Sequence, residues 1–462
     1  MIETWGFYIF SALPPGGSMD GSIAPEQYQR VYDAYLDLWA KCEDWGFDGV
    51  ALPEHHFHPL IASPSPHLVL AALASRTSRL RLTTLGSVLP LHQGWRYAEE
   101  CGMLDYITRG RFEPGIAPGT GPAEAVKVGI PAEDARPRYY SAAEILLKAM
   151  QSATVTHHDE FYNLDEVELI PPMRPGRPVW ATVMSTPSAQ WCGGLGVKMA
   201  TAWMPTSQAA DLAAAYRESA SDAGNPTGPE MLGLRRRVWV AESDAQAQQE
   251  YEATVDLVGA FAGEAFETAD ETVRQMMMHP DDYAIGSPET VAERLIEQCR
   301  AGGYGTVMMF PDFAQFTMAQ QHRTHELISQ RVAPLLRSAE VGEGTGSAPS
   351  KQRARKRSGK QAIVAGSYKV AMKTPMGPID GGLELVVKGG GLCGRVTTMM
   401  GTFDFDTGAV DGSRARWQAE AETPMGPMKM EGEAIVDGDD IWGDIDLGAG
   451  MPKLTFEGTR GA

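Results

Sequence analysis

A glutamate and two histidines follow a short apolar segment near the start of the chain. Residues 49–52 are Gly-Val-Ala-Leu, and Glu54, His55 and His56 come directly after Pro53. The apolar run predicts a buried strand, and the polar cluster would lie at its C-terminal end. A carboxylate and two imidazoles at that position could act as general base, general acid or metal ligands.

Two other interpretations of this cluster stay open. It could be the polar end of a loop, or His55 and His58 could hold a metal ion. No second group of His, Cys or carboxylate residues follows at ligand spacing, and His157 and His158 lie in a segment whose composition indicates a turn. We therefore expect no metal site.

The elements that must position the cluster alternate between strands and helices. Eight strands are expected, at 5–10, 49–52, 80–86, 110–115, 179–183, 198–201, 235–240 and 306–310. Eight strands alternating with helices predict a (β/α)8 TIM barrel, in which the C-terminal strand ends face the active site. A doubly wound sheet is the competing fold, but no Gly-x-Gly-x-x-Gly follows the first strand.

Three segments interrupt this alternation. The Pro- and Gly-rich piece 117–138 predicts a loop over the barrel mouth, and 154–170 predicts a β-hairpin. Residues 261–285 are acidic and rich in methionine, which indicates an insertion.

The chain changes character after about residue 340. Residues 341–360 are Gly- and Ser-rich and then basic, which could indicate a nucleic-acid tail but is more typical of a solvated linker. Residues 361–462 show strand-like alternation between Gly and Asp-Gly turns, and Thr-Pro-Met-Gly-Pro occurs at both 374–378 and 423–427. This repeat predicts hairpins of a small, lipocalin-like all-β barrel domain. We expect domains at 1–340 and 361–462, joined by that linker.

Composition excludes several classes of protein. The 462 residues carry a formal net charge of −19, which argues against nucleic acid or an anionic membrane as a partner. No apolar run is long enough to span a membrane, and residues 1–4 lack the features of a secretory signal. Five scattered cysteines fit free thiols in a reducing compartment. A cytoplasmic location is expected.

Short motifs in a fixed order identify a family resemblance. They are found at 47–50, 53–57, 78–84, 88–91, 98–100, 103–105, 110–113, 161–163, 286–293 and 306–310. In this order they resemble the bacterial luciferase-like flavin-dependent monooxygenases, over about residues 1–338. That family has the (β/α)8 fold and uses a reduced flavin together with oxygen.

The resemblance implies a set of site residues. The family's active-site histidine falls on His55, as general base or hydrogen-bond partner. A non-prolyl cis peptide that often lies under the flavin ring maps to Leu85–Gly86, and the flavin-phosphate positions map to Ser185 and Ser188, where a helix begins. Two simpler interpretations stay open: Gly86 could belong to an ordinary glycine bulge, and Ser188 could be only a helix cap.

One position departs from the family. An arginine usually follows the fourth strand and reaches the phosphate, but Pro118 stands there and offers neither charge nor N–H. Either flavin is held more weakly, or another cation such as Arg177 replaces the arginine.

The implied function is oxygenation of an apolar small molecule, such as a carbonyl compound, by reduced FMN that a partner flavin reductase supplies. Two alternatives stay open: hydride transfer with the deazaflavin F420, and a non-catalytic flavin- or ligand-binding protein. The oligomeric state is left open, with a homodimer among the options.

Overall fold

The structure is a computed structural model whose chain forms two compact units, Met1–Pro349 and Ser350–Ala462. The described residues are 1–12, 23–57, 61–119, 123–201, 203–254, 279–312, 316–342, 364–374, 377–388, 391–398, 401–411, 414–423, 426–437, 440–446 and 454–460. Most of the expected linker, and with it the expected domain boundary, lies outside them.

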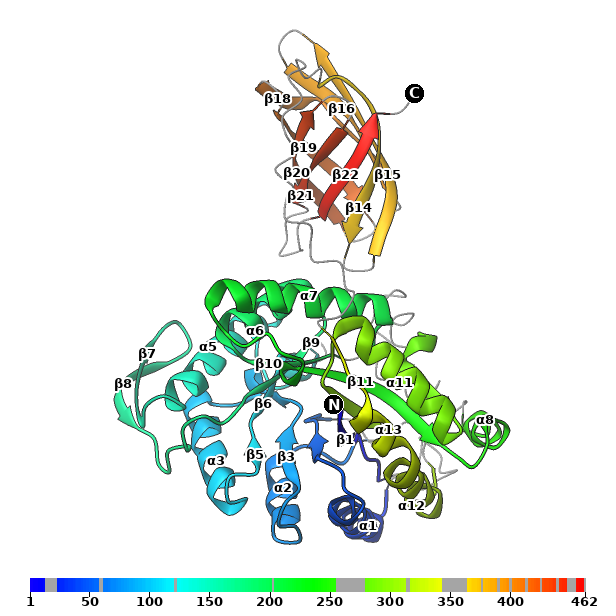
Figure 1. Cartoon of the computed structure of the whole chain (residues 1–462). Helices are drawn as coiled ribbons and strands as arrows, with labels where there is room; N and C mark the ends of the chain where they lie inside the picture. The colour runs from blue at the N-terminus through cyan, green and yellow to red at the C-terminus, as the bar shows by residue number, and fades with distance from the viewer. Residues whose placement is uncertain are drawn as a thin grey trace. The chain divides into compact units, whose positions relative to one another are not determined.

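The first unit is a closed barrel of parallel strands (Figure 1). Each strand pairs with the next along the chain, and β13 pairs with β1 to close the ring. The bounds are β1 Glu3–Phe7, β2 Gly49–Leu52, β3 Arg81–Thr84 with β4 Ser87–Val88, β5 Phe112–Glu113 with β6 Gly115–Ala117, β9 Trp180–Val183, β10 Lys198–Thr201, β11 Leu232–Val240 and β13 Thr306–Phe310. Two expected strands are thus interrupted, and a short extra strand, β12 Tyr283–Gly286, pairs with β11. The prediction of a TIM barrel is confirmed.

Helices surround this barrel (Figure 1). Their bounds are α1 Pro25–Asp44, α2 Pro66–Ala74, α3 Gly94–Ile107, α4 Ala123–Lys127, α5 Ala132–Ala149, α6 Thr186–Leu195, α7 Thr206–Ala223, α8 Asp244–Glu252, α11 Pro288–Gly302, α12 Met318–Leu327 and α13 Ala333–Ser338. Within the described ranges, no helix has the length and apolarity that crossing a membrane requires.

The buried apolar side chains form two layers, because neighbouring strand residues point to opposite faces. On β1, Phe7 belongs to the inner layer that fills the barrel, and the next residue, Tyr8, packs in the outer layer against the helices. The inner layer is notably aromatic and includes Trp5, Trp180 and Trp239. The barrel is therefore a packed core, with its strand ends free to carry chemistry.

Two expectations for the loops are wrong. The segment 117–138 is not wholly a loop, because it contains α4 and the first turns of α5. Pro137 lies inside α5, yet that helix is held by a buried stripe that includes Ala135, Tyr139 and Ala142. His157 and His158 lie on strand β7 (Thr154–His158) rather than in a turn, and β7 pairs with β8 (Asn163–Glu168) in the predicted hairpin. The expected insertion at 261–285 falls mostly outside the described residues.

The second unit is an antiparallel β-barrel. Its strands are β14 Gly366–Thr374, β15 Gly377–Lys388, β16 Gly391–Thr398, β17 Gly401–Phe405, β18 Thr407–Asp411, β19 Arg414–Thr423, β20 Gly426–Asp437, β21 Asp440–Asp446 and β22 Leu454–Arg460. Pairing of β15 with β16 closes a ring of eight strands, with β17 beside β16. Tyr368, Trp417 and Phe456 are among the side chains that fill it. The prediction of an all-β barrel is confirmed.

Each copy of the repeated segment lies at a hairpin of this barrel. Thr374 pairs with Gly377 between β14 and β15, and Thr423 pairs with Gly426 between β19 and β20. Gly377 and Gly426 both open the second strand of their hairpin. The repeat therefore marks two hairpins of the barrel, as its composition predicts.

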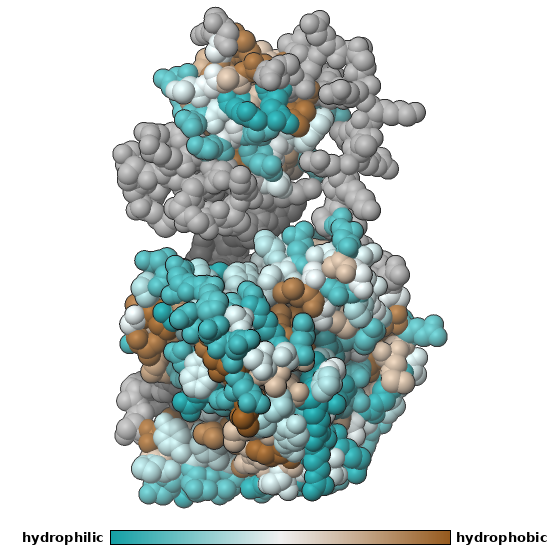
Figure 2. Space-filling view, turned by 90° about the vertical axis from the view of Figure 1, so that its left-hand side faces the viewer, coloured by the Kyte–Doolittle hydropathy of each residue, from teal (hydrophilic) through white to brown (hydrophobic). Residues whose placement is uncertain are grey.

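The surface of the first unit carries apolar side chains on two helices. Figure 2 looks onto the side where α3 and α5 lie and shows hydrophobic groups among hydrophilic ones. The large exposed apolar residues of α2 and α3 are Leu68, Trp95, Met103, Tyr106 and Ile107.

Candidate active site

Each predicted site residue follows the C-terminal end of a barrel strand. His55 comes after β2, Leu85 and Gly86 after β3, and Ser185 after β9. A hydrogen bond joins the first two ends, because the Glu54 amide donates to the Gly86 carbonyl oxygen at 3.3 Å. Parallel strands of a barrel end at the same rim, so the candidate site is a rim of loops over the aromatic interior.

Glu54 is buried and is shared by two histidines. The Nε2 atoms of His56 and His92 lie 2.9 and 2.8 Å from its carboxylate oxygens. Burial alone would raise the pKa of Glu54, but hydrogen bonds and charge from His56 and His92 outweigh burial and lower this pKa to about 2. The hydrogen bond to Glu54 in turn raises the pKa of His56. Two of the three residues in the original cluster are therefore bonded to each other, and His92 was not anticipated.

His55 faces a different carboxylate. Its Nδ1 lies 3.5 Å from Oε1 of Glu124 on α4, and the same oxygen accepts the backbone N–H of His56 at 3.1 Å. Burial works to raise the pKa of Glu124, but His55 and the amide of His56 lower it overall. A proton on Nδ1 facing Glu124 leaves Nε2 of His55 able to accept a proton. Nothing in the sequence points to Glu124, because its Pro- and Gly-rich segment predicts a loop, whereas the structure has helix α4 there.

The second carboxylate oxygen of Glu124 lacks a hydrogen-bond partner among the described residues. This atom, Oε2, is buried. Buried carboxylate oxygens are normally hydrogen-bonded, so this atom has room for a donor that lies outside the described residues.

The peptide bond Leu85–Gly86 is cis, as the resemblance implied. Leu85 is buried in the inner aromatic layer. A side chain at Gly86 would not fit, because a Cβ there would lie 2.6 Å from the carbonyl oxygen of Ile116. Close contact between adjacent strands thus accounts for the glycine.

Two hydroxyls meet where α6 begins. Ser185 Oγ donates to Ser188 Oγ at 3.0 Å, and Ser185 is the N-terminal cap residue of α6 without bonding its amides. Free amides and hydroxyls at a helix N-terminus are suited to an anion. The chemistry of these hydroxyls and amides fits the phosphate of a flavin.

Arg177 lies far from the residues assigned to the flavin phosphate. It lies before β9, whereas Ser185 lies after it, so the length of the strand separates them. Its Nη1 donates to the Gly110 carbonyl, and its Nε lies 3.8 Å from Asp105 Oδ1. Pro118 follows β6 and is partly exposed. These partners hold Arg177 at the end where strands begin, which favours the other alternative, a phosphate site without this cation.

Metal binding finds no support in the described ranges, where no three His, Cys, Asp or Glu residues form a metal-binding group. His58, the alternative partner for His55, lies outside those ranges. All five cysteines are free thiols.

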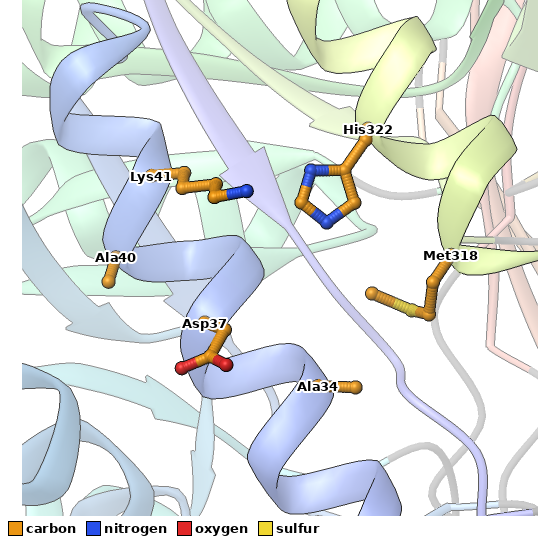
Figure 3. Close-up of a pocket in the computed structure, with 6 residues that line it drawn as sticks. All are labelled: Ala34, Asp37, Ala40, Lys41, Met318 and His322. Carbon is orange, nitrogen blue, oxygen red and sulfur yellow. The ribbon is translucent and has the colours of Figure 1, made fainter.

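A groove on the outside of the barrel is separate from this rim. It lies between α1 and α12, and its lining residues are Ala34, Asp37, Ala40, Lys41, Met318 and His322 (Figure 3). The Lys41 amino group points toward the ring of His322, and burial together with that charge lowers the pKa of His322. Because helices rather than strand ends form it, the groove is not part of the candidate site.

Comparisons with known proteins agree with this architecture. The family model "Luciferase-like monooxygenase" matches residues 12–305. Protein y4wF of Sinorhizobium fredii is 36% identical over 223 residues, which cover 47% of this chain and 64% of that protein. The oxygenase component of flavin-dependent trigonelline monooxygenase from Acinetobacter baylyi is 25% identical over 233 residues, which cover 49% and 64%. The chain therefore spans just under two thirds of the length of these two relatives.

A solved structure shares the fold of the first unit. It is the oxygenating constituent of 3,6-diketocamphane monooxygenase from Pseudomonas putida, in complex with FMN. The TM-score is 0.60 at 20% identity, covering 74% of this chain and 100% of that one.

Proposed function

Because this chain belongs to the luciferase-like monooxygenase family, we propose that its barrel is the oxygenase of a two-component, FMN-dependent system. It would use reduced FMN and O2 to oxygenate an apolar small molecule such as a carbonyl compound. A separate flavin reductase would supply the reduced flavin. The relative described as an oxygenase component and the neighbour solved with FMN support this assignment.

The pairing of His55 with Glu124 carries the proposal. An imidazole with a carboxylate on one ring nitrogen has its other nitrogen directed to a reaction partner. Here the carboxylate is held at 3.5 Å, and the imidazole follows a barrel strand, where active sites of this fold lie.

The residues around the rim would divide the binding of FMN among them. Bound reduced FMN supplies the electrons that activate O2. We assign its phosphate to the hydroxyls of Ser185 and Ser188 and to the amides at the start of α6. We assign its ring to the surface of Leu85 and Gly86, where the apolar side chain of Leu85 excludes water.

His55 is assigned as the proton carrier. Its Nε2 takes a proton from the reacting substrate, and the Glu124 carboxylate stabilises the resulting imidazolium through Nδ1–H. The second carboxylate, Glu54, instead fixes His56 and His92 and so holds the loop after β2 in place.

Titration with FMN, reduced FMN and F420 tests the cofactor assignment, with oxygen uptake measured for each reduced cofactor. Tighter binding of reduced FMN and oxygen uptake that depends on it are expected. Preference for F420 without oxygen uptake would support the hydride-transfer alternative, and binding without turnover would support the non-catalytic one.

The partners are proposed on the same basis. We expect a reductase partner, a cytoplasmic location and a homodimer, for which the exposed apolar side chains of α2 and α3 provide a surface. Analytical ultracentrifugation measures the dimer directly, and a strictly monomeric protein at micromolar concentration would contradict it.

A further inference from the structure

The side chain of Arg235 on strand β11 points into the barrel. Three arginines follow one another at 235–237, and strand alternation places Arg236 on the face opposite to Arg235. Only 2% of Arg235 is exposed. Its guanidinium carbon lies 4.9 Å from the ring centre of Trp203, 5.9 Å from that of Phe310 and 6.0 Å from that of Phe7.

These rings place the guanidinium at the reactive end of the barrel. Phe7 is the last residue of β1, Phe310 is the last residue of β13, and Trp203 follows β10. All three belong to the inner layer that also contains Leu85 of the candidate site. The positive charge of Arg235 therefore lies near the C-terminal strand ends, as His55 does.

Part of this guanidinium has no partner. Nη2 donates to both oxygens of Asp282, at 3.1 Å each, whereas Nε and Nη1 are buried and find no acceptor among the described residues. Buried donors that lack an acceptor are destabilising, so they are rare unless a ligand completes them.

Its neighbour Arg236 shows the contrast. Nε of Arg236 donates to Gln298 at 3.0 Å, Nη1 to the Arg235 carbonyl at 3.0 Å and Nη2 to Thr206 at 3.5 Å. Of these two adjacent arginines, only Arg235, which points into the barrel, has buried N–H donors without an acceptor among the described residues. Those donors are able to bind a ligand.

The charges around Arg235 favour an anion. The Asp282 carboxylate, which is fully buried, lies within 3.7 Å of a guanidinium nitrogen from each of the three arginines. Asp281 also acts on Arg236, so two negative charges face three positive ones and one positive charge is left in excess. Burial lowers the pKa of Arg235 to about 10 even though Asp282 works in the opposite direction.

We propose that Arg235 binds the substrate, through an anionic oxygen such as a carboxylate or enolate, while an apolar ring or chain of the substrate packs among Phe7, Trp203 and Phe310. This inference rests on the proposed function, because it places the substrate at the C-terminal strand ends, where FMN would also bind. It refines the substrate class from an apolar carbonyl compound to an apolar molecule with an acidic group.

A matched pair of probes tests this binding without any flavin. Calorimetric titration with 3-phenylpropionate and with 3-phenylpropan-1-ol compares the same apolar body with and without an anionic group. The unmodified protein should bind the acid at least about 10-fold more tightly, as expected for a charge-assisted hydrogen bond. Arg235→Gln should abolish that preference and Arg235→Lys should keep part of it, while the control Arg236→Lys should leave it intact.

Three results would overturn the inference: no preference for the acid in the unmodified protein, a preference that survives in Arg235→Gln, or an Arg235→Gln variant that loses FMN affinity but keeps acid affinity. The last result would assign the guanidinium to the flavin instead. Circular dichroism establishes that each variant is folded, and Arg235→Lys carries the test if Arg235→Gln does not fold. If the acid binds through Arg235 but the protein binds no FMN, the proposed function fails, while Arg235 remains an anion-binding residue.

Discussion

Replacing Glu54 with glutamine should destabilise the barrel strongly at neutral pH. Only 2% of the Glu54 side chain is exposed, and the imidazoles of His56 and His92 both hydrogen-bond its carboxylate. Glutamine keeps the shape but removes the charge, and its NH2 group cannot accept a hydrogen bond from a histidine. Both imidazoles also lie 2.9 Å from Oε1, so a glutamine carbonyl there would be shared by two donors without a charge, and the contact of His92 with Oε2 at 2.8 Å would be lost.

The magnitude follows from the pKa of Glu54. Lowering a carboxyl pKa from 4.5 to about 2 corresponds to about 3 kcal/mol in favour of the ionised folded form. Because the folded pKa lies below the unfolded one, this stabilisation is complete above pH 4.5 and is lost as the pH falls toward 2. The difference in unfolding free energy between Glu54→Gln and the unmodified protein should follow the same course.

Urea unfolding followed by tryptophan fluorescence at pH 7.5, 5.5 and 4 measures this difference, with Glu133→Gln on the exposed side of α5 as the control. An NMR titration should also show a lower His56 pKa in Glu54→Gln. A loss below about 0.5 kcal/mol at pH 7.5, comparable to an ordinary surface substitution, would refute the reasoning, as would an unchanged His56 titration.

Three further changes test other parts of the structure. Burial raises the pKa of Asp312 to about 7, so its carboxyl ionises at lower pH in the unfolded state than in the folded state. The free energy of unfolding should therefore fall by up to about 4 kcal/mol between pH 4 and 7. Asp312→Asn should flatten this pH dependence in urea titrations, and a pH dependence that persists in the variant would contradict the assignment. A Cβ at Gly115 would lie 1.4 Å from the Thr84 carbonyl oxygen, so Gly115→Ala should lower the free energy of unfolding by at least about 1–3 kcal/mol and with it the melting temperature. The control Gly194→Ala should not, because the nearest atom to a Cβ there is the Ser219 hydroxyl at 3.3 Å. Arg177→Ala should leave FMN affinity unchanged, since Arg177 lies at the far end of β9, and a 10-fold loss would show that it reaches the phosphate.

Much of the first unit could be predicted because its strands are buried on both faces. Such strands form continuous apolar runs, as residues 49–52 and 306–310 do, and their alternation with helices leaves few possible folds. The cis peptide at Leu85–Gly86 was located through the ordered motifs of the family rather than through local composition.

The carboxylate behind His55 could not be predicted in the same way. Glu124 lies on a five-residue helix in a Pro- and Gly-rich segment, and nothing in its spacing connects it with a residue 69 positions earlier. Its contact with His55 exists because both chain segments follow strands that end at one rim. Tertiary structure, not local pattern, determines that pair.

The hydrogen-bond partners of Arg177 and Arg235 could not be predicted from the sequence either. Arg177 has the charge of a phosphate ligand, but it lies before β9, whereas the serines assigned to the phosphate lie after that strand. Arg235 was expected only as part of a strand, because a basic run gives no sign of which donors remain without a partner. Sequence patterns predict which face a residue occupies, whereas satisfaction of its hydrogen bonds depends on neighbours brought in by the fold.

Transfer of labelled oxygen tests the central claim most directly. The protein loaded anaerobically with reduced FMN would be mixed with isotopically labelled O2 and a panel of aliphatic and aromatic aldehydes and ketones, some of which also carry a carboxylate. We predict one labelled oxygen atom in a product, and a yield lowered about 100-fold or more in His55→Ala with reduced-FMN affinity unchanged. Oxidation of the flavin without label in any product, or an equal yield from His55→Ala, would contradict the account.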